Sequence, residues 1–221
     1  MSADRNNLAR WPIVYATTII SCLLLWLPGC SGLQKQPTAT SDKLSLKTNI
    51  QLSAVANSPF KQVNVQFYSS QPKQLVFRVI SDLSKTVDWF DNLASIETLQ
   101  AYSNTEFLVR SVINSPWPFT ARELITCVAT DFSKHQTRIK ISACSNRVAK
   151  DANLVRITQA ESSWLIEEKS GLVKISYKAW IDPAGKVPIA LFNQQLVYST
   201  RKSIDKLRIL IAKASPENYS Y

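Results

Sequence analysis

The chain of 221 residues contains four glycines and one histidine, and these scarcities exclude several kinds of chemistry. The histidine, His135, lies in a polar stretch typical of a turn. A histidine-based metal site, a Ser-His-Asp triad and a Cys-His pair are therefore not expected. Gly171 and Gly185 are too few for a glycine-rich phosphate loop or a Gly-x-Ser-x-Gly elbow. We expect no catalytic residue, no metal and no cofactor.

Cysteine is also scarce, and two of the four cysteines lie near the N-terminus. Cys22 falls in an apolar run and Cys30 follows it, which leaves Cys127 and Cys144 for the folded part. They are too far apart in the sequence for a Cys-x-x-Cys site. They form either a disulfide in an oxidising compartment or two free thiols, and the sequence does not decide between these states.

The charge is strongly positive, with 26 Lys plus Arg against 16 Asp plus Glu and a net charge of +10. In the cytosol such a charge favours nucleic acid, whereas outside it the charge favours anionic lipid head groups. A solvated basic surface without a partner explains it equally well. The N-terminal segment described next predicts export from the cytosol, so we expect no nucleic-acid partner.

The N-terminal segment has the pattern of an export signal. Two arginines precede an apolar run over residues 11–27, and a small residue, Gly29, comes directly before Cys30. Gly29-Cys30 resembles the bacterial lipobox, in which the cysteine is diacylated and becomes the new N-terminus, although Pro28 departs from that pattern. The alternative is an uncleaved anchor, for which about 17 apolar residues are barely enough.

We therefore predict a lipoprotein signal over 1–29, lipidation at Cys30 and a flexible polar tether over 30–44. Ser31, rather than an aspartate, follows the lipidated cysteine. Under the usual Gram-negative rule this residue predicts a lipid-anchored protein on the periplasmic face of the outer membrane. The remaining chain, 45–215, is predicted to form one domain.

Apolar periodicity predicts the elements of this domain. Alternation indicates strands over 45–55 and 61–69, near 96–113 and 121–131, and around 139–143. Pro72 begins a helix with one apolar face. A hairpin over 161–181, turned at Ser170-Gly171, places Trp164 opposite Tyr177 and Ile166 opposite Ile175 on one face.

A long amphipathic helix over 188–213 ends the pattern, with apolar residues in one stripe and basic residues on its remaining surface. A curved antiparallel sheet needs a cover for its apolar face, and this helix is long enough. We predict an α+β helix-grip fold, in which a curved antiparallel sheet wraps around the C-terminal helix.

Four passages resemble the START family, the steroidogenic-acute-regulatory-related lipid-transfer domains. They are VDWF (87–90), PWPFTARE (116–123), WIDPAGKVP (180–188) and the helical pattern of 195–208. Their order matches the family's tryptophan-containing turn, proline-containing loop with its Arg-Asp strand, Asp-Pro-Gly-Gly-x-Ile-Pro motif and final helix. Glu123 stands in place of the usual aspartate, and Ala184 in place of a glycine.

The resemblance implies a monomeric, non-enzymatic protein that holds a lipid or sterol-like ligand in a tunnel between the sheet and the last helix. Such a tunnel is concave and mostly apolar. The residues expected at the ligand are Arg122, Glu123, Trp164, Ile166, Ile175, Tyr177, Ala179, Phe192 and Leu196. Trp117 and Phe119, in the proline-bounded loop, are expected at the mouth of the tunnel, where they contact a membrane or close the end of the core.

Arg122 and Glu123 are adjacent on a strand, so their side chains point to opposite faces. An inward Arg122 needs a carboxylate or a ligand head group, because a charge that faces an apolar cavity is costly unless it is paired. Alternatively, Arg122 fastens its strand to the loop around Asp182 or to Trp89. Likewise, Trp164 and Tyr177 fit either ordinary core aromatics or ligand contacts.

Two other functions remain open at the sequence level. A scaffold lipoprotein with a sealed core binds nothing, and a cavity of several hundred Å³ distinguishes a carrier from it. A helix-grip enzyme of the cyclase or hydrolase type needs an acidic or basic group inside the cavity, for which Glu123 and Glu161 are candidates.

Overall fold

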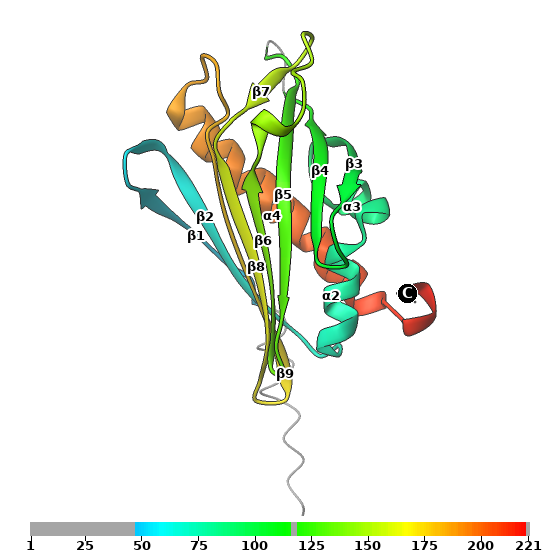
Figure 1. The fold of residues 1–221 in the computed structure, drawn as a ribbon. Helices are drawn as coiled ribbons and strands as arrows, with labels where there is room; N and C mark the ends of the chain where they lie inside the picture. Colours follow the sequence, from blue (N-terminus) through cyan, green and yellow to red (C-terminus); the bar gives the residue numbers. More distant parts are fainter. Residues whose placement is uncertain (1–46, 116–118, 220–221) are drawn as a thin grey trace, which may run out of the picture. The chain divides into compact units, whose positions relative to one another are not determined.

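The computed structural model describes residues 47–115 and 119–219 (Figure 1). The strands are β1 (Asn49–Val55), β2 (Ser58–Ser69), β3 (Leu93–Ala101), β4 (Glu106–Ile113), β5 (Arg122–Phe132), β6 (Gln136–Ala143), β7 (Val155–Ile157), β8 (Ala160–Lys169) and β9 (Leu172–Ile181). The helices are α2 (Lys73–Ser81), α3 (Leu83–Trp89) and α4 (Ile189–Lys213), with short 3-10 turns η1 (Ser145–Arg147) and η2 (Pro216–Tyr219). The predicted signal 1–29, Cys30, the tether 30–44 and Trp117 lie outside the described residues.

Within these ranges the strands form one sheet in the order β1-β2-β9-β8-β6-β5-β4-β3. The neighbours in this order are antiparallel, and β7 adds a short parallel pairing to β5. Helix α4 runs diagonally across one face of the sheet, with α2 and α3 beside its C-terminal half (Figure 1). The predicted α+β helix-grip fold is confirmed.

The β8–β9 hairpin has the predicted register. Trp164 pairs with Tyr177 and Ile166 pairs with Ile175. Ser170 and Gly171 have φ angles of 52° and 78°, as a tight two-residue hairpin turn requires. Because a one-residue slip would turn every side chain to the other face, this register decides which residues can reach the cavity.

The helix boundaries follow the prolines. The helix expected from Pro72 begins one residue later at Lys73, with Pro72 as its N-cap at a φ of −57°. Pro188 precedes α4 in the same way at a φ of −60°. Proline suits these positions because its fixed φ is compatible with a helix start and its missing N–H has no partner there. None of the helices in the described residues is both long and apolar enough to cross a membrane.

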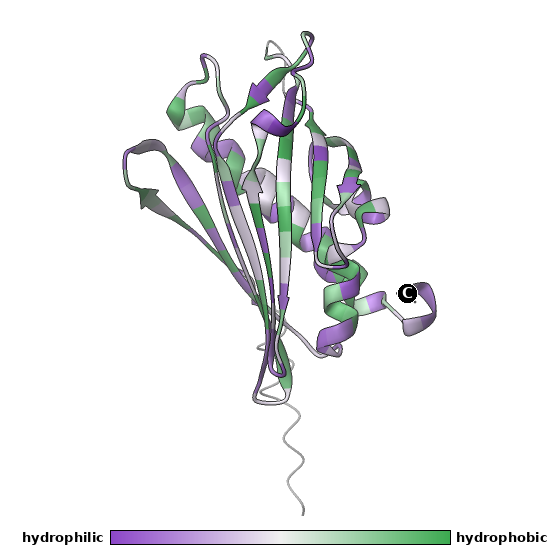
Figure 2. Ribbon diagram, in the orientation of Figure 1, coloured by the Kyte–Doolittle hydropathy of each residue, from purple (hydrophilic) through white to green (hydrophobic). Residues whose placement is uncertain are grey.

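The apolar core lies where α2 and the C-terminal half of α4 meet the sheet. Apolar and polar residues alternate along the strands that supply it (Figure 2). The fully buried apolar residues of this cluster are Val63, Val65, Phe67, Val76, Val79, Ile166, Ile175, Ile204, Leu207 and Ile211. We call this cluster the packed half of the space between α4 and the sheet.

Candidate ligand-binding cavity

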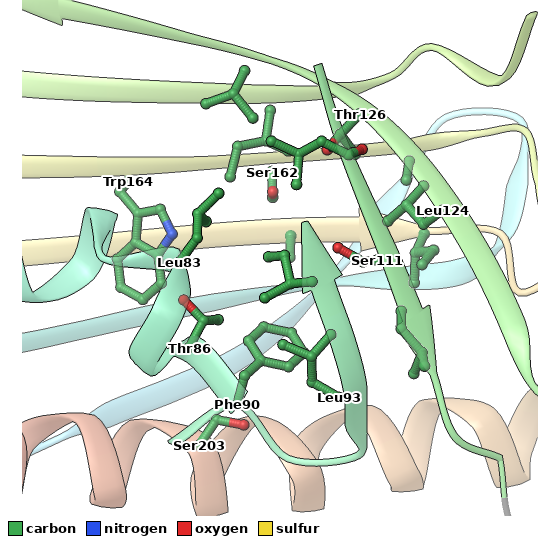
Figure 3. Close-up of a pocket in the computed structure, with 18 of the residues that line it drawn as sticks. Leu83, Thr86, Phe90, Leu93, Ser111, Leu124, Thr126, Ser162, Trp164 and Ser203 are labelled. Carbon is green, nitrogen blue, oxygen red and sulfur yellow. Dashed lines mark hydrogen bonds between the residues drawn. The ribbon is translucent and has the colours of Figure 1, made fainter. Parts of the chain in front are cut away.

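The remaining space between α4 and the sheet is hollow. It forms a cavity of about 1610 Å³, which we call the hollow half. Figure 3 shows side chains from several elements converging on it, among them Phe90, Ser111, Thr126, Ser162 and Ser203. The hollow half begins where the packed half ends, because Ile204 belongs to both.

The β8–β9 hairpin forms one wall of the cavity. Trp164 stacks on Tyr177 with ring centroids 4.2 Å apart, and both rings line the cavity. Ala179, on the same face of β9, also lines it, whereas Ile166 and Ile175 on the other side of the aromatic pair are sealed in the packed half. The stacked pair therefore marks the boundary between the two halves.

Helix α4 forms the roof over the hollow half with its N-terminal turns. Phe192 and Leu196 line the cavity. Phe192 packs edge-on against Phe60 of β2, with the two ring centroids 5.1 Å apart. The backbone N–H of Lys61 donates to Asn193 Oδ1 at 3.0 Å, which ties the same turn to β2. These N-terminal turns thus have fewer buried anchors than the C-terminal turns, which carry Leu207 and Ile211.

Polar contacts fix the middle of α4 to the α3–β3 connection. Lys202 Nζ lies 2.7 Å from Asp91 Oδ1, and the backbone N–H of Asp91 donates to Ser203 Oγ at 2.9 Å. The hydrogen bond to Asp91 raises the pKa of Lys202. These contacts lie between the N-terminal turns of α4, which cover the cavity, and the C-terminal turns, which belong to the packed half.

Arg122 lines the cavity, as do Ser115 and Phe119. Its Nε donates to Pro183 O at 3.3 Å, and its Nη1 donates to Ser115 Oγ at 2.8 Å and Thr120 O at 2.5 Å. The guanidinium thus joins β5 to two connections, the one between β4 and β5 and the one between β9 and α4. Its carbon lies 5.7 Å from the centre of the Phe119 ring, which also lines the cavity.

Glu123 points to the opposite face of β5, away from the cavity. Its carboxylate lies 2.6 Å from Arg110 Nε and 2.6 Å from Arg156 Nη2. Burial alone would raise the pKa of Glu123, but the hydrogen bonds and charges of the two arginines outweigh it, so the pKa is lowered. Arg156 also donates to the carbonyls of Ser145, Val148 and Ala149. We call Glu123, Arg110 and Arg156 the outer clamp.

A disulfide joins Cys127, on the same outer face of β5, to Cys144 just after β6. It answers the question that the sequence left open. The outer clamp and the disulfide hold strands β4 to β7 together from outside, behind the wall of the hollow half. Neither β7 nor the two arginines of the clamp were predicted from the sequence.

Several polar groups face the cavity without a hydrogen-bond partner within the described residues, among them the hydroxyls of Ser111 and Ser162. The Tyr177 hydroxyl makes no hydrogen bond within the described residues, and burial raises the pKa of Tyr177, so this hydroxyl stays neutral. The indole Nε1 of Trp89 is also buried, and it too has no acceptor among the described residues. Such groups can orient a ligand by a hydrogen bond without attracting a charge.

The far end of the cavity is closed by the C-terminal turn η2. Tyr219 is buried and lines the cavity there. Arg78 Nη1 donates to Tyr219 O at 3.0 Å, and Lys85 Nζ donates to Asn218 O at 3.0 Å while lying 3.8 Å above the Tyr219 ring. These contacts fasten η2 to α2 and α3.

The structure brings together most of the residues that the sequence assigned to the ligand. Those that line the cavity are Arg122, Trp164, Tyr177, Ala179, Phe192 and Leu196, and Phe119, which was expected at the mouth, lines it too. The predicted ligand contacts Glu123, Ile166 and Ile175 lie elsewhere: Glu123 faces the outer clamp, and the two isoleucines fill the packed half. Within the described residues, no group of three or more His, Cys, Asp or Glu side chains could hold a metal ion.

The sequence prediction missed the cavity residues of α3, β3 and β4, and all those of β5 except Arg122. It also overlooked the small size of several inward-facing side chains on the strands and on α4. Small residues occupy inward positions of the hollow half, namely Ser111, Ala160, Ser162, Ala179, Ser199 and Ser203. Small side chains at inward positions of strands and helices would have indicated a void.

The fold is that of START-related lipid-transfer domains. A solved STAR-related lipid transfer protein from Xanthomonas axonopodis aligns with a TM-score of 0.67 and 21% identity, covering 74% of this chain and 93% of that one. Human STARD10 aligns with a TM-score of 0.67 and 18% identity, covering 77% of this chain and 71% of that one. Human StAR-related lipid transfer protein 5 aligns with a TM-score of 0.67 and 12% identity, covering 75% of this chain and 82% of that one.

By sequence, the chain is 22% identical over 129 residues to an uncharacterized protein of Pseudomonas aeruginosa, covering 58% of this chain and 63% of that protein. The chain thus spans less than two thirds of that relative. No family model matches the chain. The comparisons therefore identify a START-like helix-grip fold.

Proposed function

We propose that this protein, with its START-like helix-grip fold, binds one lipid in the hollow half and transfers or presents it without chemical conversion. The observation that carries the proposal is the cavity of about 1610 Å³. At about 30 Å³ per non-hydrogen atom, the volume of one water molecule in the liquid, it has room for roughly 50 such atoms. A lipid with two acyl chains is of this size.

The lining favours acyl chains over water. It is supplied mainly by apolar side chains, such as Phe192 and Leu196 from the roof and Trp164 from the wall. Each methylene that moves from water into such a site contributes about 0.8 kcal/mol. A ligand-free scaffold is not favoured, because a well-packed interior leaves few voids larger than a water molecule.

A non-enzymatic role is supported by the carboxylates near the cavity. Glu123 faces the outer clamp, and Asp91 is paired with Lys202. Asp82 accepts hydrogen bonds from the backbone and hydroxyl of Ser84. Glu161 lies at the edge of the cavity and is exposed. A helix-grip enzyme remains the alternative; turnover of a bound lipid that stops in Glu161→Gln would favour it.

Membrane attachment through Cys30 is part of the proposal. The disulfide between Cys127 and Cys144 supports an extracytoplasmic location, because disulfides persist in oxidising compartments. Cys30→Ser should abolish acyl labelling and leave the signal uncleaved. Normal labelling of that variant would contradict lipidation, and sedimentation of the wild-type protein with inner membrane would contradict outer-membrane sorting.

The gate is proposed at the N-terminal turns of α4, which line the same cavity as Phe119. These turns have few buried anchors, and segments with few buried contacts open most easily. Exposed apolar residues in the same region, Ile189 and Leu191, are suited to contact a lipid surface while the roof opens.

A matched pair of variants tests the function. Ala179→Trp fills the cavity, whereas Lys178→Trp adds the same ring to the exposed, opposite face of β9. In a vesicle-to-vesicle transfer assay with fluorescent phospholipid, Ala179→Trp should lose most of the transfer rate and Lys178→Trp should retain it. Equal rates in the two variants would contradict a ligand site in the hollow half.

A further inference from the structure

Arg122 is a buried cation at the wall of an apolar cavity. Its residue surface is 7% exposed, and it lines the cavity together with Ser115, Phe119 and Pro183. Burial lowers the pKa of Arg122, but an arginine remains protonated at neutral pH. The site therefore carries a full positive charge in a poorly solvated position.

The hydrogen bonds of this guanidinium leave part of it unused. An arginine has five N–H donors. Three of them reach neutral acceptors, Pro183 O, Ser115 Oγ and Thr120 O, and the two N–H groups of Nη2 have no acceptor within the described residues. Among the described residues, Trp89 Nε1 is the one side-chain polar atom that is both fully buried and without a hydrogen-bond partner. Arg122 Nη2 also lacks a partner, so it is not fully buried and can be reached by a ligand.

No carboxylate compensates the charge of Arg122 in the part of the chain that the structure describes. Arg156 is buried to a similar degree, at 8% exposed, yet it has Glu123 at 2.6 Å. Three carboxylates among the described residues line the cavity. Asp82 is paired with Lys85 and Asp91 with Lys202, whereas Glu161 is exposed and forms no ion pair with Arg122. A buried charge without a counter-charge is costly, so an anion that reaches Arg122 would be favoured.

We propose that Arg122 binds the oxyanion of the ligand, a phosphate or a carboxylate, while the acyl chains occupy the hollow half. This assignment rests on the proposed function and narrows it to lipids whose head group carries an oxyanion. A guanidinium binds an oxyanion through short, charge-assisted hydrogen bonds, and two unused N–H groups on one nitrogen suit such a contact. The neutral contacts of Nε and Nη1 hold the side chain in position before the ligand arrives.

The test compares head groups at equal chain length and equal surface charge. The full-length protein is incubated with vesicles that contain equal amounts of phosphatidylglycerol and diacylglycerol, within a phosphatidylcholine background. The protein is then re-isolated, and its bound lipid is extracted and measured by mass spectrometry. Because all lipids share one vesicle, the basic surface of the protein cannot by itself create a preference among the bound lipids.

The wild-type protein should enrich phosphatidylglycerol about tenfold over diacylglycerol, the ratio that corresponds to 1.4 kcal/mol. Arg122→Gln should lose this preference and still carry diacylglycerol. Lys73→Gln is the matched control, because Lys73 is also a buried cation held by carbonyls, those of Ser133 and Lys134, but does not line this cavity. That control should keep the wild-type preference.

Four outcomes would overturn the inference. Equal binding of the two lipids by the wild-type protein would refute it and leave the lipid-carrier function standing, whereas no bound lipid at all would refute both. If Arg122→Gln fails to fold, the uncharged variant Arg122→Met replaces it. An unchanged preference for phosphatidylglycerol over diacylglycerol in a folded, uncharged Arg122 variant would refute the inference. Inorganic phosphate that displaces the lipid at micromolar concentration would instead assign the site to a free oxyanion.

Discussion

The two halves of the space beneath α4 are built on the same helix and the same sheet, yet one is solid and the other is hollow. In the packed half, Ile166 and Ile175 of the hairpin meet Leu207 of α4 within a fully buried cluster. In the hollow half, Ala179 of the hairpin and Leu196 of α4 face a cavity. The comparison shows that amphipathic periodicity specifies which face is covered, while side-chain size decides whether the covered space is filled.

The two halves are also stabilised differently. The packed half is held from within by close-packed apolar side chains, which gain from both desolvation and dispersion. The hollow half has no such interior, and its wall strands are held from outside by the outer clamp and by the Cys127–Cys144 disulfide.

Removing the outer clamp should have the largest effect. Glu123→Gln leaves Arg156 buried without a counter-charge, which should lower the free energy of unfolding by about 3–5 kcal/mol. Glu97→Gln, which removes the exposed partner of Arg110, should cost less than about 1 kcal/mol. Urea denaturation at pH 7 measures both values, and equal losses would contradict the buried role of Glu123.

The clamp also predicts a pH dependence. Because the pKa of Glu123 is lowered on folding, the stability it contributes is complete above the ordinary glutamate pKa of about 4.3 and is lost as the pH falls through the folded value. Acid should therefore increase hydrogen exchange in β4 and β5 before it affects β2 and β9. Uniform exchange across all four strands would contradict a separately held wall.

Truncation of matched leucines on α4 should give the next largest effect. Leu207→Ala creates a void in a packed cluster and should cost about 2–5 kcal/mol. Leu196→Ala enlarges an existing cavity and should cost less than half as much. Thermal or urea unfolding of the two variants provides the comparison, and similar costs would mean that the hollow half is closed in solution.

Removal of the disulfide should have an intermediate effect. The two cysteines are separated by 17 residues, and a loop of this length corresponds to about 2–4 kcal/mol. In the double variant Cys127→Ala/Cys144→Ala, lipid binding should persist, because Cys127 faces away from the cavity that its neighbours Thr126 and Val128 line. Loss of lipid binding in a folded double variant would assign the disulfide a role in shaping the cavity.

Filling the cavity should change stability least. Adding bulk to a packed core typically costs about 1–3 kcal/mol, but Ala179→Trp places its ring in open space and should change the free energy of unfolding by less than about 1 kcal/mol. Ile175→Trp, in the packed half, should be strongly destabilised. Equal destabilisation of these two variants would contradict the difference between the halves.

The sequence allowed the frame of the fold to be predicted but not the distinction between its halves. The hairpin register followed from alternation and from Ser170-Gly171, and α4 followed from its apolar stripe. The strand β7 is three residues long and pairs in parallel with a distant strand, so no local pattern indicates it. Ile175 and Tyr177 share one face of β9, and period-two alternation cannot tell the packed position from the open one.

The same limit applies to the charged residues. Adjacent Arg122 and Glu123 were expected to point to opposite faces, and they do, but which one faced the cavity depended on partners far away in the sequence. Arg156 on β7 and Arg110 on β4 hold Glu123 on the outer face. That arrangement leaves Arg122 on the inner face, where the sequence offered both a structural role and a ligand contact.

The most direct measurement of the central claim is native mass spectrometry of the full-length protein after incubation with phospholipid vesicles. The account predicts one bound lipid with two acyl chains per protein, lost in Ala179→Trp and retained in Lys178→Trp. A protein that carries no lipid adduct under these conditions, or one whose adduct is unchanged by Ala179→Trp, would contradict a lipid site in the hollow half.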